Sequence, residues 1–128
     1  MTVTPIYAGL ISLLFVALSF RVIGFRRQVK VALGDGGSTT LTRRLRAHGN
    51  FAEYVPIGLL LLVMLEMSGA PVWMVHILAL MLLAGRLMHG WALSFTDKSV
   101  TGRVGGMGLT LFSIGLSALA TLAYALIQ

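Results

Sequence analysis

Long apolar stretches alternate with short polar windows along the whole chain. Residues 1–20 and 104–128 carry no charged side chain, and between Arg46 and Arg86 the only charges are Glu53 and Glu66. A hydrocarbon core requires about 20 apolar residues per helix. Four spans satisfy that length, at approximately residues 5–25, 39–68, 72–95 and 100–127. The pattern therefore predicts an all-α integral membrane protein in which residues 1–128 form a single four-transmembrane-helix bundle.

Short polar segments mark the ends of these spans. The glycine-rich turn at residues 33–37 precedes Ser38 and Thr39, either of which is a good N-cap for the second helix. The composition is 57% hydrophobic and 11% charged, which is far from that of a soluble domain. The absence of cysteine excludes disulfides, thiolate metal sites and a protein thiol nucleophile. Any thiol chemistry must therefore use a thiol that belongs to a ligand.

The basic residues fall in windows that four spans place on one side of a membrane. Positive charge beside apolar spans marks the cytoplasmic side, so we expect both termini to be outside and contacts with membrane lipids near the basic windows. The net charge of +6 is explained in this way, and we expect no nucleic-acid partner. We interpret six of the basic residues as topology determinants and contacts to lipid headgroups: Arg21, Arg26, Arg27, Lys30, Arg43 and Arg44. Arg26 also lies close to the predicted site.

Polar residues inside the spans are the candidates for function, because a charged side chain at the bilayer centre costs about 2.5–3.5 kcal/mol. Residues three and four apart share a helix face. This spacing joins Arg46, Asn50 and Glu53 on the second helix, with Tyr54 beside them. It also joins Arg86 and His89 on the third helix. Arg103 lies in the first turn of the fourth, and we expect these side chains to converge at the cytoplasmic end.

Structural interpretations of the same residues remain open. Glu53 and Arg86 would neutralise each other as an ion pair between the second and third helices, and His89 would be a hydrogen-bonded packing residue. The scattered histidines lack the spacing of a metal site, so we expect no metal. Gly102 and Gly106 have the small-xxx-small spacing that allows two helices to approach closely.

The segment Arg46-Ala47-His48-Gly49-Asn50-Phe51-Ala52-Glu53-Tyr54-Val55-Pro56 closely resembles the second-helix signature of the membrane-associated proteins in eicosanoid and glutathione metabolism, the MAPEG superfamily. Residues 22–27 and 85–89 resemble the family's end of helix one and its third-helix motif. The resemblance implies a homotrimer of four-helix protomers of the bacterial type, in an inner membrane. It also implies that glutathione binds between neighbouring subunits near the cytoplasmic face.

By motif position, the resemblance implies that glutathione acts as co-substrate and that Arg103 is the catalytic, thiol-activating residue. The implied function is that of a glutathione-dependent transferase or peroxidase acting on lipophilic electrophiles, with the glutathione thiolate as nucleophile. Leu93 and Met107 depart from the pattern, because the eicosanoid-synthesising branches bring tyrosines to the site from the third and fourth helices. The implied glutathione-binding residues are Arg26, Arg46, His48, Asn50, Glu53, Tyr54 and His89.

Simple electrostatics favours such a site independently of the family. Glutathione is a net-negative tripeptide, and the second and fourth helices begin on the cytoplasmic side, so their positive dipole ends and first-turn arginines face it. Leu93 and Met107 favour the alternative of a non-catalytic membrane protein of the same fold that binds a lipid or an anionic ligand. A small four-helix exporter ranks last, because residues 1–20 contain no acid.

Overall fold

A computed structural model describes residues 1–96 and 99–127, which form four helices. Each helix is long and apolar enough to cross a membrane. The predicted all-α bundle of four membrane-spanning helices is therefore confirmed. The helices are α1 (Thr4–Val29), α2 (Thr39–Met67), α3 (Val72–Phe95) and α4 (Val100–Ile127).

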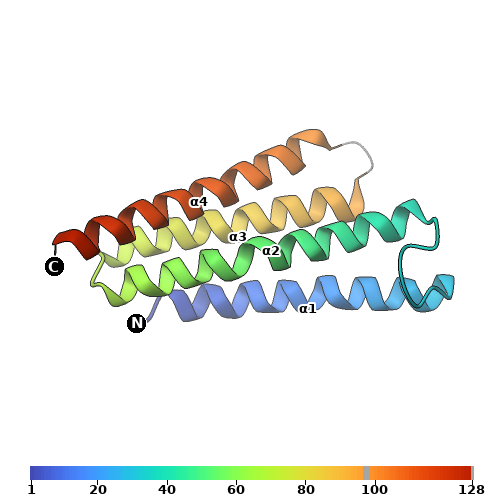
Figure 1. The fold of residues 1–128 in the computed structure, drawn as a ribbon, viewed down its shortest axis with the longest axis horizontal. Coiled ribbons are helices and arrows are strands. Elements are labelled where there is room, and N and C mark those ends of the chain that lie inside the picture. The colour runs from blue at the N-terminus through green and yellow to red at the C-terminus, as the bar shows by residue number, and fades with distance from the viewer. Residues whose placement is uncertain (97–98, 128) are drawn as a thin grey trace.

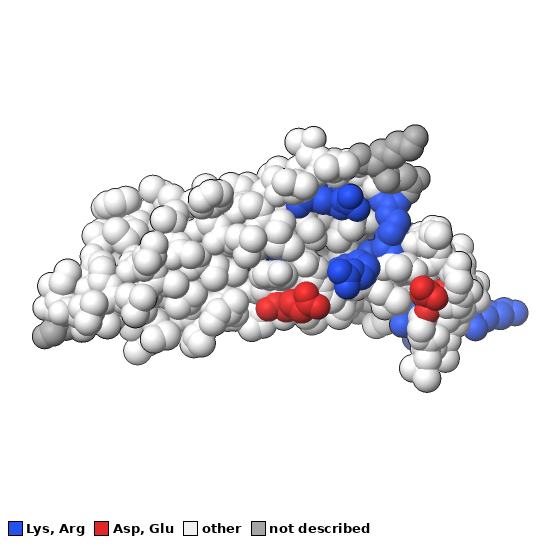
Figure 2. All heavy atoms as spheres, turned by 45° about the horizontal axis from the view of Figure 1, so that its top comes forward, with Lys and Arg blue, Asp and Glu red and all other residues white. Residues whose placement is uncertain are grey.

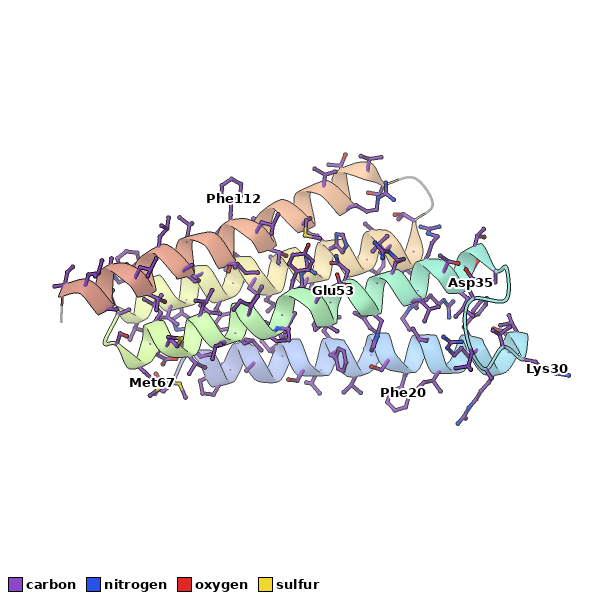
Figure 3. All side chains as sticks on the ribbon, viewed as in Figure 1. Phe20, Lys30, Asp35, Glu53, Met67 and Phe112 are labelled. Carbon is purple, nitrogen blue, oxygen red and sulfur yellow. The ribbon has the colours of Figure 1, made fainter. Side chains whose placement is uncertain are left out.

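The helices lie side by side, with α2 and α3 between α1 and α4 (Figure 1). Both ends of the chain lie at the end of the bundle that holds the α2–α3 turn, here called the turn end. The α1–α2 loop, residues 30–38, lies at the opposite end, the loop end. Lys and Arg side chains gather toward the loop end (Figure 2). Phe20 of α1 and Phe112 of α4 project outward and are each 68% exposed, as a lipid-facing surface requires (Figure 3).

The helix bounds follow the predicted spans closely, with one larger difference. The predicted spans 72–95 and 100–127 coincide with α3 and α4, and α2 ends one residue before the predicted residue 68. However, α1 continues to Val29 rather than ending at residue 25. Arg26 and Arg27 lie in its last turn, where positive charge stabilises a helix C-terminus. Lys30 then ends α1 in the left-handed conformation, with a φ of 56°.

Hydrogen bonds in the α1–α2 loop fix the start of α2. Ser38 is the N-cap, and its hydroxyl accepts from the Leu41 N–H at 3.3 Å. Asp35 accepts from the Thr42 hydroxyl at 2.7 Å and from the Gly37 N–H at 3.0 Å. These hydrogen bonds, the Thr42 bond first, lower the pKa of the Asp35 carboxyl from its ordinary value. The ionised carboxylate therefore holds the loop against the first turn of α2.

At the turn end, a second carboxylate, that of Glu66, joins two helices. Glu66, near the end of α2, accepts from the N–H groups of Val3 and Thr4, each at 2.8 Å, and from that of Thr2. The first N–H groups of a helix lack partners within the helix, and a carboxylate is well suited to satisfy them. Glu66 thus fastens the start of α1 to the end of α2, a role that was not predicted from the sequence.

Helices α3 and α4 approach closely at a pair of glycines. A Cβ placed on Gly106 would lie 2.6 Å from the His89 nitrogen and 2.8 Å from the Gly85 oxygen. The close approach predicted for Gly106 is confirmed, and its partner is Gly85. Further along, Ser113 donates to the Leu78 carbonyl at 2.7 Å. This contact places a polar side chain of α4 in the interior of the bundle, against the backbone of α3.

Candidate functional site

A cavity of about 670 Å³ lies between α2, α3 and α4 toward the loop end. Such a volume is within the range of small-molecule sites. Its polar lining comes from arginines on α2 and α4, an asparagine and a histidine, and its apolar lining comes mainly from α4. The lining residues are Arg43, Arg46, Asn50, His89, Leu93, Arg103, Val104, Met107, Gly108 and Leu111.

One face of α2 supplies Arg43, Arg46 and Asn50. The three residues are spaced by three and four positions, and this spacing keeps them on one side of an α-helix. Arg46 is exposed, whereas Asn50 is partly buried deeper along the same face. The result is a basic rim above a neutral amide, an arrangement suited to an acidic ligand.

His89 and Arg103 connect the other two walls. The Nδ1 atom of His89 lies 3.0 Å from the backbone oxygen of Arg103. Because a carbonyl oxygen can only accept, Nδ1 must donate, which leaves Nε2 as the acceptor of the neutral ring. The histidine is 8% exposed, while the Arg103 side chain is exposed. This hydrogen bond fixes the first turn of α4 against α3 beside the cavity.

Arg86 lies behind the cavity and is only 1% exposed. Its guanidinium donates to the Asn50 Oδ1 atom at 2.7 Å and to the Thr110 hydroxyl at 2.9 Å, and its third nitrogen lies 3.9 Å from the Met107 sulfur. The Tyr54 ring centroid lies 5.7 Å from the guanidinium carbon. Asn50 and Met107 both line the cavity, so Arg86 supports it from behind.

The predicted ion pair between Glu53 and Arg86 is wrong for the protomer. Within residues 1–96 and 99–127, Arg86 has no carboxylate partner and bonds instead to Asn50 and Thr110. Successive residues are rotated by about 100° around a helix. Tyr54, one turn after Asn50, faces Arg86 together with it. Glu53 lies about 100° around the helix from Tyr54 and is exposed. Figure 3 shows Glu53 midway along α2, between Met67 and Asp35.

Four of the predicted glutathione-binding residues do not line the cavity: Glu53 and Tyr54, described above, and Arg26 and His48. Arg26 donates to carbonyl oxygens of the α1–α2 loop, at 2.8 Å for Gly34 and 3.2 Å for Ala32. His48 lies 3.0 Å from the Ser19 hydroxyl, and its ring packs on Phe15 with centroids 4.8 Å apart. In this protomer Arg26 shapes the loop and His48 joins α2 to α1. Of the predicted site residues, the structure brings together Arg46, Asn50, His89 and Arg103 at the cavity.

Two polar residues of this region were not predicted as part of the site. The sequence predicts a topology role for Arg43, although its position three residues before Arg46 also indicates the same helix face. Thr110 had no such signal on its own. It lies four residues after Gly106, and the glycine contact brings α4 close enough for Thr110 to accept from Arg86.

Comparison with known proteins identifies the family. Residues 4–123 match the sequence model of the MAPEG family. The chain is also 44% identical over 122 residues to the inner membrane protein YecN of Escherichia coli strain K12, covering 95% of this chain and 92% of the relative. The inner membrane protein YecN of E. coli O6:H1 strain CFT073 matches equally well. With four helices able to span a membrane and a match over nearly the whole sequence, the chain belongs to the MAPEG family.

Proposed function

We propose that the protein is a glutathione-dependent membrane transferase or peroxidase that acts on lipophilic electrophiles. The observation that carries the proposal is the cavity itself, which combines Arg46, Asn50, His89 and Arg103 between three helices. Glutathione carries two carboxylates and one ammonium group. An acidic peptide of this kind is well matched by arginines at the rim and an amide below them.

Arg103 is the residue proposed to activate the thiol. It lies in the first turn of α4, where the N-terminal end of the helix dipole adds to the guanidinium charge. A free thiol has a pKa of about 8.5, and both features favour the thiolate. The thiolate sulfur then forms a bond to the electrophilic carbon, and the leaving group departs with its bonding electrons. The protein contributes orientation and charge stabilisation to this step.

The electrophile is proposed to arrive from the bilayer. Leu93, Val104, Met107 and Leu111 form an apolar wall of the cavity, which suits a lipid-soluble partner for the thiolate. The basic residues at the loop end support an orientation with this end in the cytoplasm, where glutathione is found, and both termini outside.

A homotrimer is proposed from the position of Glu53. Its carboxylate is exposed, and it lies thirteen residues before Glu66, about 20 Å along α2 from the turn end. Figure 3 places it well inside the helix. A carboxylate facing hydrocarbon at such a depth is costly. A neighbouring copy that covers Glu53, together with a ligand held between the copies, removes that cost.

A second candidate is a non-catalytic protein of the same fold that binds a lipid or an anionic ligand. Leu93 and Met107 favour it, because both line the cavity at positions where the eicosanoid-synthesising branches are expected to place tyrosines. Apolar side chains there provide no hydrogen bonds to a ligand.

The test is to purify the protein in lipid nanodiscs and measure the thermal midpoint with and without glutathione, then the conjugation of 1-chloro-2,4-dinitrobenzene. A ligand that binds only the folded state raises the midpoint by mass action. We expect a rise in the wild type and none in Arg46→Ala, together with glutathione-dependent product. A rise without product would favour the non-catalytic candidate, and no rise at all would refute the proposed function.

A further inference from the structure

Arg86 carries its positive charge deep inside the bundle. Its side chain is buried between α2, α3 and α4, and it lies fourteen residues after the start of α3, about 21 Å into a membrane-spanning helix. Its hydrogen-bond partners are the neutral groups of Asn50 and Thr110. In the described part of the chain no carboxylate pairs with it. A buried cation with only neutral partners is costly, and more so at membrane depth.

The counter-charge must reach Arg86 from the side of the cavity. With 1% exposure, the guanidinium is closed to the lipid-facing surface of the protomer. Asn50 and Met107, which contact Arg86, also line the cavity, so they form the thin layer between the guanidinium and a bound ligand.

The Arg86 contact also determines which atoms Asn50 offers to the cavity. A guanidinium can only donate, so the atom of Asn50 at 2.7 Å must be the carbonyl oxygen Oδ1. If the amide were rotated by 180°, its NH₂ group would face the N–H groups of Arg86, and two donors cannot form a hydrogen bond. The amide NH₂ group is then left for the cavity, where it can only donate. A ligand atom placed there must accept hydrogen bonds, and an anionic acceptor also compensates the charge of Arg86.

We propose that Arg86 is a positioning residue that holds Asn50 as a hydrogen-bond donor, and that a carboxylate of the bound ligand, received by the Asn50 amide, supplies the counter-charge for Arg86. The inference rests on the proposed function in taking glutathione as that ligand. It assigns the Asn50 end of the cavity to a carboxylate and leaves the thiol to Arg103.

The decisive variant is Asn50→Asp, which has nearly the same shape. In the ligand-free variant the introduced carboxylate supplies the missing counter-charge directly to Arg86, so the thermal midpoint should rise by about 5 °C, the shift expected for roughly 1 kcal/mol in a protein of this size. The second carboxylate oxygen would face the cavity and repel an anionic ligand. The midpoint rise caused by glutathione should therefore disappear. Asn50→Ala is the matched control, which should abolish the glutathione response while lowering the ligand-free midpoint.

Two further measurements separate positioning from a general structural role. Glutathione affinities of Arg86→Gln, Asn50→Ala and the double variant should show at least a tenfold loss in each, with no further loss in the double variant, because Arg86 acts through Asn50. S-methylglutathione, which keeps both carboxylates but cannot form a thiolate, should still stabilise the wild type. Loss of that effect would place the thiolate rather than a carboxylate at Asn50 and overturn the assignment.

The inference and the proposed function fail in different ways. If the wild type responds to glutathione and Asn50→Asp responds equally, the inference is wrong and the proposed function stands. If the wild type does not respond but Asn50→Asp still raises the ligand-free midpoint, Arg86 does lack a counter-charge and glutathione is not its source. A ligand-free midpoint of Asn50→Asp as low as that of Asn50→Ala would overturn the inference whatever glutathione does.

Discussion

Replacing Gly106 by alanine should loosen the bundle at the point that builds the site. The added Cβ would lie 2.6 Å from the His89 nitrogen and 2.8 Å from the Gly85 oxygen, both backbone atoms that no rotamer change can move. Ordinary contacts of a Cβ begin at 3.4 Å, so α3 and α4 must separate by about 0.8 Å. Overpacking of this kind costs about 1–3 kcal/mol.

Gly115→Ala is the matched control, because Gly115 also lies on α4 and its added Cβ would have no neighbour within 4 Å. Both changes gain the same helix propensity of about 1 kcal/mol. The difference between the two variants therefore measures the contact alone, and we expect Gly106→Ala to melt about 4–12 °C below Gly115→Ala.

The same displacement should weaken the site. The hydrogen bond from His89 to the Arg103 carbonyl spans the two helices one turn from Gly106, and separation of the helices lengthens it. Circular dichroism melts in nanodiscs, with and without glutathione, provide both measurements. If Gly106→Ala is as stable as Gly115→Ala and responds equally to glutathione, the close α3–α4 contact is neither necessary for stability nor coupled to the cavity.

Three further outcomes test separate parts of the structure. Glu66→Gln should lower the thermal midpoint in nanodiscs by several degrees, since hydrogen bonds to a charged group contribute about 1.5–3 kcal/mol, and should leave glutathione affinity unchanged. Asp35→Asn should make the α1–α2 loop more sensitive to protease at neutral pH. Because the pKa of Asp35 is lowered in the folded protein, its contribution is present above the ordinary value of 3.8 and is lost as the pH falls through the lowered one, so the difference between the two proteins should vanish in acid. Arg103→Leu should largely spare glutathione binding but reduce conjugation tenfold to thousandfold and shift the ultraviolet thiolate titration to higher pH; unchanged turnover and titration would leave Arg103 only a topology role.

The fold could be predicted because each membrane-spanning helix corresponds to a long, uninterrupted stretch of apolar residues in the sequence. Between Arg46 and Arg86, for example, a single short polar turn separates two spans, and Pro56, a potential helix breaker, lies inside α2 without ending it. The end of α1 was harder to predict. Basic residues predict the limit of the span, but they also stabilise a helix C-terminus, so α1 continues through Arg26 and Arg27 to Val29.

The sequence predicted site residues correctly only where their spacing along one helix places them on the same face of that helix. Arg46 and Asn50 are one turn apart and face the same cavity. His48 lies between them in sequence but about 200° around the helix from Asn50, so it faces α1. Motif membership therefore identified the correct helix for His48 and not its direction. Arg26 does not reach the cavity for another reason. The chain reverses at Lys30, and the loop carbonyl oxygens that follow accept hydrogen bonds from Arg26. Helix periodicity does not predict such a loop contact.

The two carboxylates of α2 differ in whether the protomer itself provides them with hydrogen-bond donors. Glu66 lies at the turn end, where the free N–H groups of α1 hold it. Glu53 lies midway along the same helix and is exposed, and Arg86 lies nearby with neutral partners. Among the residues that the structure describes, an exposed carboxylate and a buried guanidinium, neither with a partner of opposite charge, thus lie close to Asn50. A zwitterionic ligand such as glutathione, with an ammonium group and carboxylates, complements both, whereas a simple anion complements only Arg86. The charge pattern thereby favours a zwitterionic ligand over a simple anion at this site.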